Sequence, residues 1–131
     1  MNTFRCGAYA VMAMGLLGCA STSAPPDAAF PVGRYASGEA MISFAADGGM
    51  QGAMKSTGQV WGRGRYRAEG PVVTMTDEWY AKGLPMPANC VGVPGRYRWT
   101  HDAGTLSFQV IEDACAPRIE AVQGQAWSRI D

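Results

Sequence analysis

The chain has 131 residues, of which 47% are hydrophobic and 17% are charged. Its 11 basic residues balance its 11 acidic residues, so the formal net charge at pH 7 is zero. A chain of this length is expected to form a single domain. The balanced charge excludes a strong global field for binding nucleic acid or an anionic membrane surface.

The N-terminal segment has the three parts of an export signal. Arg5 supplies one positive charge, residues 7–17 are apolar, and the small residue Gly18 precedes Cys19. The motif Leu16-Leu17-Gly18-Cys19 resembles the lipobox of bacterial lipoproteins, which implies cleavage before Cys19 and lipidation of that cysteine. A transmembrane helix is disfavoured, because a span needs about 20 apolar residues and residues 7–17 are fewer. A signal for soluble secretion is the second alternative.

This interpretation divides the chain into three parts. Residues 1–18 form the signal peptide, residues 19–31 the lipidated cysteine with a flexible tether, and residues 32–131 the folded domain. The tether is rich in proline and small polar residues and has no periodicity. We therefore expect a lipid-anchored protein of the cell envelope. Ala20 rather than Asp follows the cysteine, which in a Gram-negative cell predicts location on the outer membrane, facing the periplasm.

The four cysteines allow few disulfide pairings. Cys6 leaves with the signal peptide and Cys19 would be acylated, which leaves Cys90 and Cys115. Disulfides persist in exported proteins, and one that closes this loop would contribute about 3.5 kcal/mol. A two-cysteine metal site is the alternative, but the chain has a single histidine and no CxxC or HxxxH spacing. We expect no metal and no cofactor.

Alternating polar and apolar residues predict β-strands throughout the domain. Gly-Arg-Tyr recurs at residues 33–35, 64–66 and 95–97, which indicates either a repeated hairpin unit or coincidence. No window sustains an amphipathic helical period. Short connections between strands predict an all-β, antiparallel up-and-down barrel, whose closure removes exposed edges. The expected strands are 32–37, 39–46, 50–55, 58–68, 71–77, 95–101, 105–112 and 121–129.

The last third of the chain carries a recognisable pattern. It comprises Cys90, Gly95-Arg96-Tyr97-Arg98-Trp99, Leu106, Phe108, Asp113, Cys115, Arg118 and Trp127. This pattern is similar to that of small exported bacterial proteins of lipocalin-like type, which implies a calycin-type barrel and no reaction. Residues 42–52 are similar to the opening of META-type envelope domains, without the Gly-Cys-Asn that follows there. Lysozyme-inhibitor lipoproteins share the size, barrel and disulfide, but their Ser-Gly-x-x-Tyr loop has no good match.

Candidate catalytic groups are few. His101 is expected in a hairpin turn beside Asp102, and no motif supplies a nucleophile, so we interpret it as a turn residue. The acidic pairs at 77–78 and 112–113 supply at most one inward group each, because strand neighbours point to opposite faces. We interpret them as solvated strand ends or turn caps rather than as a glycosidase carboxylate pair.

Asp113 and Arg118 flank Cys115. We expect an ion pair or backbone hydrogen bonds that hold the disulfide loop, and contact with a ligand is the alternative.

Two sets of side chains are candidate binding surfaces. One set is expected on the outer wall, either solvated or as a strip for an anionic polymer or lipid head group: Arg63, Arg65, Arg67, Arg96 and Arg98. The other is expected inside, either as packed core or as the lining for a small apolar ligand: Tyr35, Phe44, Tyr66, Tyr97, Trp99, Phe108 and Trp127. The loop 78–94 is expected either to cover the barrel or to bind a protein through Trp79, Tyr80, Leu84 and Met86.

These features predict a membrane-anchored, non-enzymatic envelope lipoprotein. It would bind a small apolar or amphipathic ligand or an envelope component. The alternative is a protein-interaction module with a solid core, such as a hydrolase inhibitor or an envelope assembly or stress factor. The expected partners are the membrane, through the lipid anchor, and a small ligand or an envelope protein, with no nucleic acid.

Overall fold

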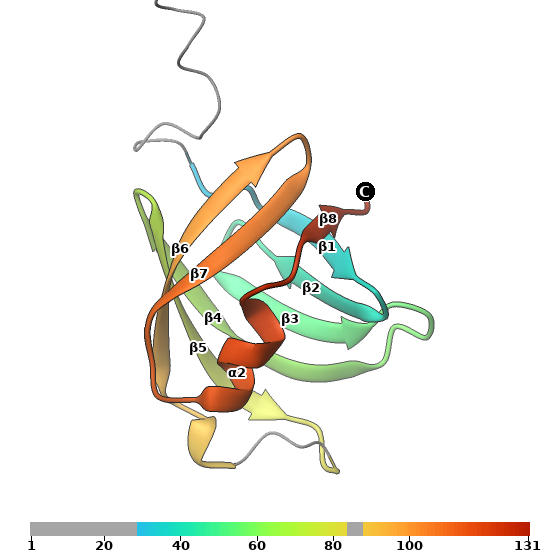
Figure 1. Ribbon diagram of the computed structural model, residues 1–131. Coiled ribbons are helices and arrows are strands. Elements are labelled where there is room, and N and C mark those ends of the chain that lie inside the picture. Colours follow the sequence, from blue (N-terminus) through green and yellow to red (C-terminus); the bar gives the residue numbers. More distant parts are fainter. Residues whose placement is uncertain (1–28, 84–87) are drawn as a thin grey trace, which may run out of the picture.

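In a computed structural model, which describes residues 29–83 and 88–131, the strands form a closed antiparallel barrel (Figure 1). Each strand pairs with its neighbours in sequence, and β8 closes the barrel onto β1. The up-and-down barrel predicted from the sequence is therefore confirmed. The strands are β1 (Gly33–Ser37), β2 (Ala40–Phe44), β3 (Gly49–Met54), β4 (Val60–Glu69), β5 (Val72–Tyr80), β6 (Pro94–Asp102), β7 (Thr105–Asp113) and β8 (Trp127–Arg129).

The expected signal peptide, Cys19 and nearly all of the expected tether lie outside the described residues. Within the described part of the chain, no helix is long and apolar enough to span a bilayer.

The barrel has two different ends. We call one the Phe30 end; it carries the turns β2–β3, β4–β5 and β6–β7. We call the other the helix end; it carries the helix α2 (Ala116–Val122), residues 55–59 and the connection between β5 and β6 with the 3-10 helix η1 (Ala88–Cys90). In Figure 1, α2 lies in front of β4 and β5, below β8.

The predicted strand at 121–129 is wrong over most of its length. Residues 116–122 are helical, and β8 has only three residues. Pro117 lies in the first turn of α2, where its missing N–H is no loss and its fixed φ favours the helix. Beside β7, where β8 is absent, the side chain of Gln123 accepts a hydrogen bond of 2.6 Å from the backbone N–H of Val110.

The Phe30 end is closed by an aromatic cluster. The ring of Phe30 lies 5.0 Å from Phe44, 5.2 Å from Tyr66 and 5.3 Å from Trp99. Phe30 is only 9% exposed, although we expected it in the tether. The packed domain therefore includes residues before position 32, because this ring fills the mouth of the barrel.

The β6–β7 turn is tighter than predicted. Asp102 pairs with Thr105, so the turn consists of Ala103 and Gly104, with φ values of 52° and 82°. Positive φ at both positions is the requirement of a type I′ hairpin. His101 therefore lies within β6, and our assignment of it to the turn is wrong.

Three register shifts interrupt the ladders, between β3 and β4, β4 and β5, and β6 and β7. The residues left unpaired are Trp61, Glu78 and Ile111. A bulge adds one residue to a strand and so reverses the direction of the side chains that follow it. The bulges in β4 and β5 determine which side chains enter the barrel at the helix end.

Candidate functional site

A buried ion cluster closes the helix end, and Arg118 of α2 is its centre. The Arg118 side chain is 3% exposed. Its Nε and Nη2 donate to the two carboxylate oxygens of Asp113, each at 2.7 Å, and its Nη1 donates to Oδ2 of Asp77 at 3.0 Å. Nη2 also donates to the carbonyl of Val93 at 2.7 Å. One guanidinium thus joins α2 to β5, to β7 and to the segment before β6.

Asp113 is held from several sides. Its Oδ1 accepts a hydrogen bond of 2.9 Å from the backbone N–H of Cys115, whose sulfur lies 2.17 Å from that of Cys90, at disulfide distance. The ion pair and the backbone hydrogen bond expected around Cys115 are both present. Gly95 pairs with Asp113, and a Cβ at that position would clash with the carboxylate. The glycine therefore allows the carboxylate to approach β6.

Asp77 belongs to the same cluster, which the sequence analysis missed. It is 9% exposed, so our interpretation of it as a solvated strand end is wrong. Its position gave a signal, because it alternates with the inward residues Val73 and Met75. After Asp77, the bulge at Glu78 turns Tyr80 inward, and the Tyr80 hydroxyl donates to Asp77 Oδ2 at 2.5 Å.

The cluster fixes the protonation of its members. Burial alone would raise the pKa of Asp113, but hydrogen bonds from Arg118, from the Tyr97 hydroxyl and from the Cys115 backbone together lower it. Burial, reinforced by hydrogen bonds to carboxylates, raises the pKa values of Tyr80 and Tyr97. Burial opposes the charge of Arg118, but its carboxylate partners raise its pKa above the ordinary value. At neutral pH, Asp113 is ionised, both tyrosines are neutral and Arg118 is charged.

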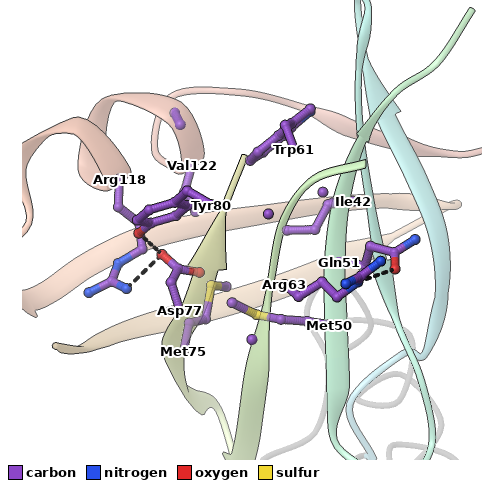
Figure 2. Close-up of a pocket in the computed structure, with 14 residues that line it drawn as sticks. Ile42, Met50, Gln51, Trp61, Arg63, Met75, Asp77, Tyr80, Arg118 and Val122 are labelled. Atoms are coloured by element: carbon purple, nitrogen blue, oxygen red, sulfur yellow. Dashed lines mark hydrogen bonds and ion pairs between the residues drawn. The ribbon is translucent and has the colours of Figure 1, made fainter. Parts of the chain in front are cut away.

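A small cavity lies beside the cluster (Figure 2). Its volume is about 50 Å³ and it is partly open to solvent. Gly52, Gly62 and Gly64 leave room on β3 and β4, and the bulge in β4 places the Trp61 ring against Gly52. Most of the lining is apolar, with Asp77 and Arg118 at one side. Ligand pockets usually measure about 300–1,000 Å³, so this cavity accepts only a small group.

The aromatic residues considered as a ligand lining form the packed interior. They are buried, except Tyr66, which is partly buried and packs against the others. His101 also faces inward, with its ring perpendicular to Tyr35 at 6.1 Å. Among the described residues, its Nε2 is the one buried side-chain polar atom without a hydrogen-bond partner.

The arginines considered as an anion strip all lie on the outer wall and are exposed. Thr74 of β5 separates Arg67 from Arg96, so the two sets flank one strand. Arg96 lies 3.7 Å from Glu112 in an exposed ion pair. Arg65 donates to the carbonyl of Asp47 at 2.9 Å.

Exposed apolar side chains gather at the helix end. Trp79 is 42% exposed, and the guanidinium of Arg63 lies 5.1 Å from the centre of its ring. Trp79 and Tyr80 were expected in a loop but are the last residues of β5. Leu84 and Met86 lie outside the described residues. We define the helix-end surface as Met54, Arg63, Trp79, Val91 and Ile111.

Comparison with known proteins identifies no relative. No family model matches the chain, and neither a curated protein nor a solved structure matches it. The closed eight-stranded barrel is consistent with a lipocalin-like fold.

Proposed function

We propose that the protein is an exported, lipid-anchored and non-enzymatic binding module of the cell envelope. It recognises a partner protein with the helix-end surface and does not carry an apolar ligand in its interior.

The filled interior is the observation that carries this proposal. Tyr35, Val73, Tyr97 and Leu106 have no exposed surface, and Phe30 closes one mouth of the barrel. An apolar ligand would have to displace these side chains. This favours the protein-interaction alternative over the carrier.

The composition of the helix-end surface supports a protein partner. Tryptophan and arginine are enriched at protein interfaces, where they contribute much of the binding energy. Trp79 and Arg63 stack on each other in the open. The helix end also carries the exposed side chains of Met54, Val91 and Ile111.

The position of the N-terminus supports an orientation relative to the membrane. The chain enters the barrel at Phe30, opposite the helix end. The ten residues between Cys19 and Phe30 span at most about 35 Å. A lipid on Cys19 would hold the Phe30 end towards the membrane and leave the helix end facing away from it.

Two observations support a non-enzymatic role. Both oxygens of Asp113 accept hydrogen bonds from within the cluster. His101, the single histidine of the chain, lies near the β6–β7 turn at the opposite end of the barrel, away from these carboxylates.

Site-specific photo-crosslinking in cells tests the partner proposal. A photoreactive residue replaces Trp79, and the matched control replaces Thr100, which is exposed on β6. We expect a discrete protein adduct at position 79 and none at position 100. The absence of an adduct at 79, or equal adducts at both positions, would contradict the proposal.

Fractionation of cells that express Cys19→Ala tests the anchor separately. We expect the wild type in the membrane fraction and the variant, unlipidated, in the soluble envelope fraction. A variant retained in the membrane fraction would refute the lipid anchor but not the partner.

A further inference from the structure

We propose that the cavity at the helix end is a binding site for an alkylammonium group, which donates a hydrogen bond to Oδ1 of Asp77. This site does not depend on a partner protein, because a free amine and a lysine side chain present the same group.

The first argument is an acceptor without a donor. Oδ2 of Asp77 accepts hydrogen bonds from Tyr80 and Arg118. Within the described part of the chain, no hydrogen bond reaches Oδ1. Figure 2 shows this second oxygen turned away from Arg118, towards the space between Met75 and Met50. Asp77 is 9% exposed, and a charged donor in the cavity forms a stronger hydrogen bond to this oxygen than water does.

The second argument is the sign of the charge. Arg118 faces two carboxylates, so the cluster has one negative charge more than it has positive charges. The two oxygens of Asp113 accept hydrogen bonds from Nε and Nη2 of Arg118, whereas Asp77 accepts a single hydrogen bond from this guanidinium, through Nη1. Asp77 is therefore the less neutralised of the two carboxylates, and it is the one that lines the cavity. Arg63 also lines the cavity, but its guanidinium is engaged at the outer wall, where it donates to Gln51 and stacks on Trp79.

The third argument is size and lining. A cavity of about 50 Å³ has room for some three to five water-sized positions, at about 10–15 Å³ for each. An ammonium with two or three carbons fills this space. Ile42, Met50 and Trp61 line it, and such side chains suit methylene groups better than they suit a hydrated metal ion.

Titration with n-propylammonium chloride, followed by amide and indole NMR at pH 7, tests the site. We expect saturable shifts at Trp61, Ala121 and Val122, with a dissociation constant on the order of 1 mM, as is usual for so few atoms. The neutral isostere n-propanol should bind at least tenfold more weakly, and sodium chloride at equal ionic strength should cause no such shifts. Equal binding of propanol, or no saturation by 50-fold this concentration, would overturn the proposal.

Two variants separate charge from space. Asp77→Asn keeps one oxygen for Tyr80 and Arg118 and turns an amide donor to the cavity, so binding should weaken at least tenfold. Gly62→Ala leaves the charges unchanged; its Cβ would lie 3.4 Å from the Tyr80 ring, an ordinary contact, and would narrow the cavity. We expect at least threefold weaker binding from it, so the test survives if Asp77→Asn does not fold. Asp102→Asn, exposed at the other end, is the control and should bind as the wild type does.

A second probe distinguishes the two sources of the group. If Nα-acetyl-lysine methylamide binds as tightly as propylammonium or more tightly, the site accepts a protein side chain; if it binds tenfold more weakly, the site accepts a free amine. Both results support the site. A missing crosslink at position 79 with intact propylammonium binding would contradict the proposed partner alone, and the reverse result would contradict the ammonium site alone.

Discussion

The two ends of this barrel are closed by different chemistry. At the Phe30 end, neutral aromatic rings meet edge to face, and the Tyr66 hydroxyl and the Trp99 indole donate to backbone carbonyls. At the helix end, a buried guanidinium bridges two carboxylates, and a disulfide-distance cysteine pair links η1 to the start of α2.

This difference shows where the barrel is open to regulation and binding. Aromatic packing is indifferent to moderate changes of pH, whereas the ion cluster depends on the ionisation of Asp113. The helix end also keeps a cavity and an acceptor oxygen beside the ion cluster. The cavity and the acceptor oxygen, which suit the recognition of a ligand, therefore lie at the end that the ion cluster closes.

The largest effect is expected from Arg118→Met. The substitution replaces the aliphatic part of the side chain but leaves two carboxylates without their cation, so unfolding should become easier by about 3–5 kcal/mol. Urea denaturation at pH 7 measures this loss. Arg34→Met is the matched control, because its ion pair with Asp131 is exposed and should contribute under about 1 kcal/mol. Equal losses in the two variants would show that the buried cluster is no more important than a surface pair.

Removal of the cysteine pair should follow closely. We expect Cys90→Ser with Cys115→Ser to lower the free energy of unfolding by about 3.5 kcal/mol, the entropy gained by opening a loop with sequence separation 25. Denaturation of the oxidised wild type and of the double variant measures this difference in the free energy of unfolding. Hydrogen exchange should accelerate in α2 before it does so at the Phe30 end, and uniform acceleration would argue against a local role.

Phe30→Ala should cost about 3 kcal/mol, since it removes a buried ring with three aromatic neighbours. Val32→Ala is the control, because Val32 is 38% exposed and should change stability by less than about 0.5 kcal/mol. A similarly small loss for Phe30→Ala would mean that the aromatic plug does not hold this end closed.

The smallest effect is expected in the β6–β7 turn. Ala103 has a positive φ of 52°, which L-residues with a Cβ adopt at a cost, whereas Asn tolerates it and Asn-Gly is the preferred type I′ pair. Ala103→Asn should therefore stabilise the protein by about 0.5–1 kcal/mol in thermal or urea unfolding. Gly104→Ala should destabilise it, and the opposite order would refute the assigned turn.

Local patterns made much of this fold predictable. Alternation and turn residues predicted the first seven strands to within a few positions, and the short connections favoured a closed meander. The helix α2 was not predicted, because seven residues are too few to show a helical periodicity, although Pro117 marked its start. Phe30 stands alone among small residues, and its burial depends on a barrel mouth formed by distant strands.

The site was less predictable than the fold. Asp77 shares the alternation of its inward neighbours, so its burial was accessible from the sequence. Tyr80 and Trp61 were not, because both are directed inward by bulges that depend on pairing between strands. The position of Arg118 depends in turn on α2.

The free energy of unfolding of the wild type, Arg118→Met and Phe30→Ala at pH 7 and pH 4 tests the contrast between the ends most directly. In the wild type, the pKa of Asp113 lies below its ordinary value of 3.8, so its stabilisation is present above that value and is lost only as the pH falls through the lower, folded-state pKa. In Arg118→Met, the loss of the cation that lowers the pKa of Asp113 leaves its burial to raise that pKa, so Asp113 takes up a proton more readily at pH 4. The account predicts that the penalty of Arg118→Met at least halves at pH 4 while that of Phe30→Ala stays unchanged. A penalty for Arg118→Met that is the same at both pH values, or an equal change in both variants, would contradict it.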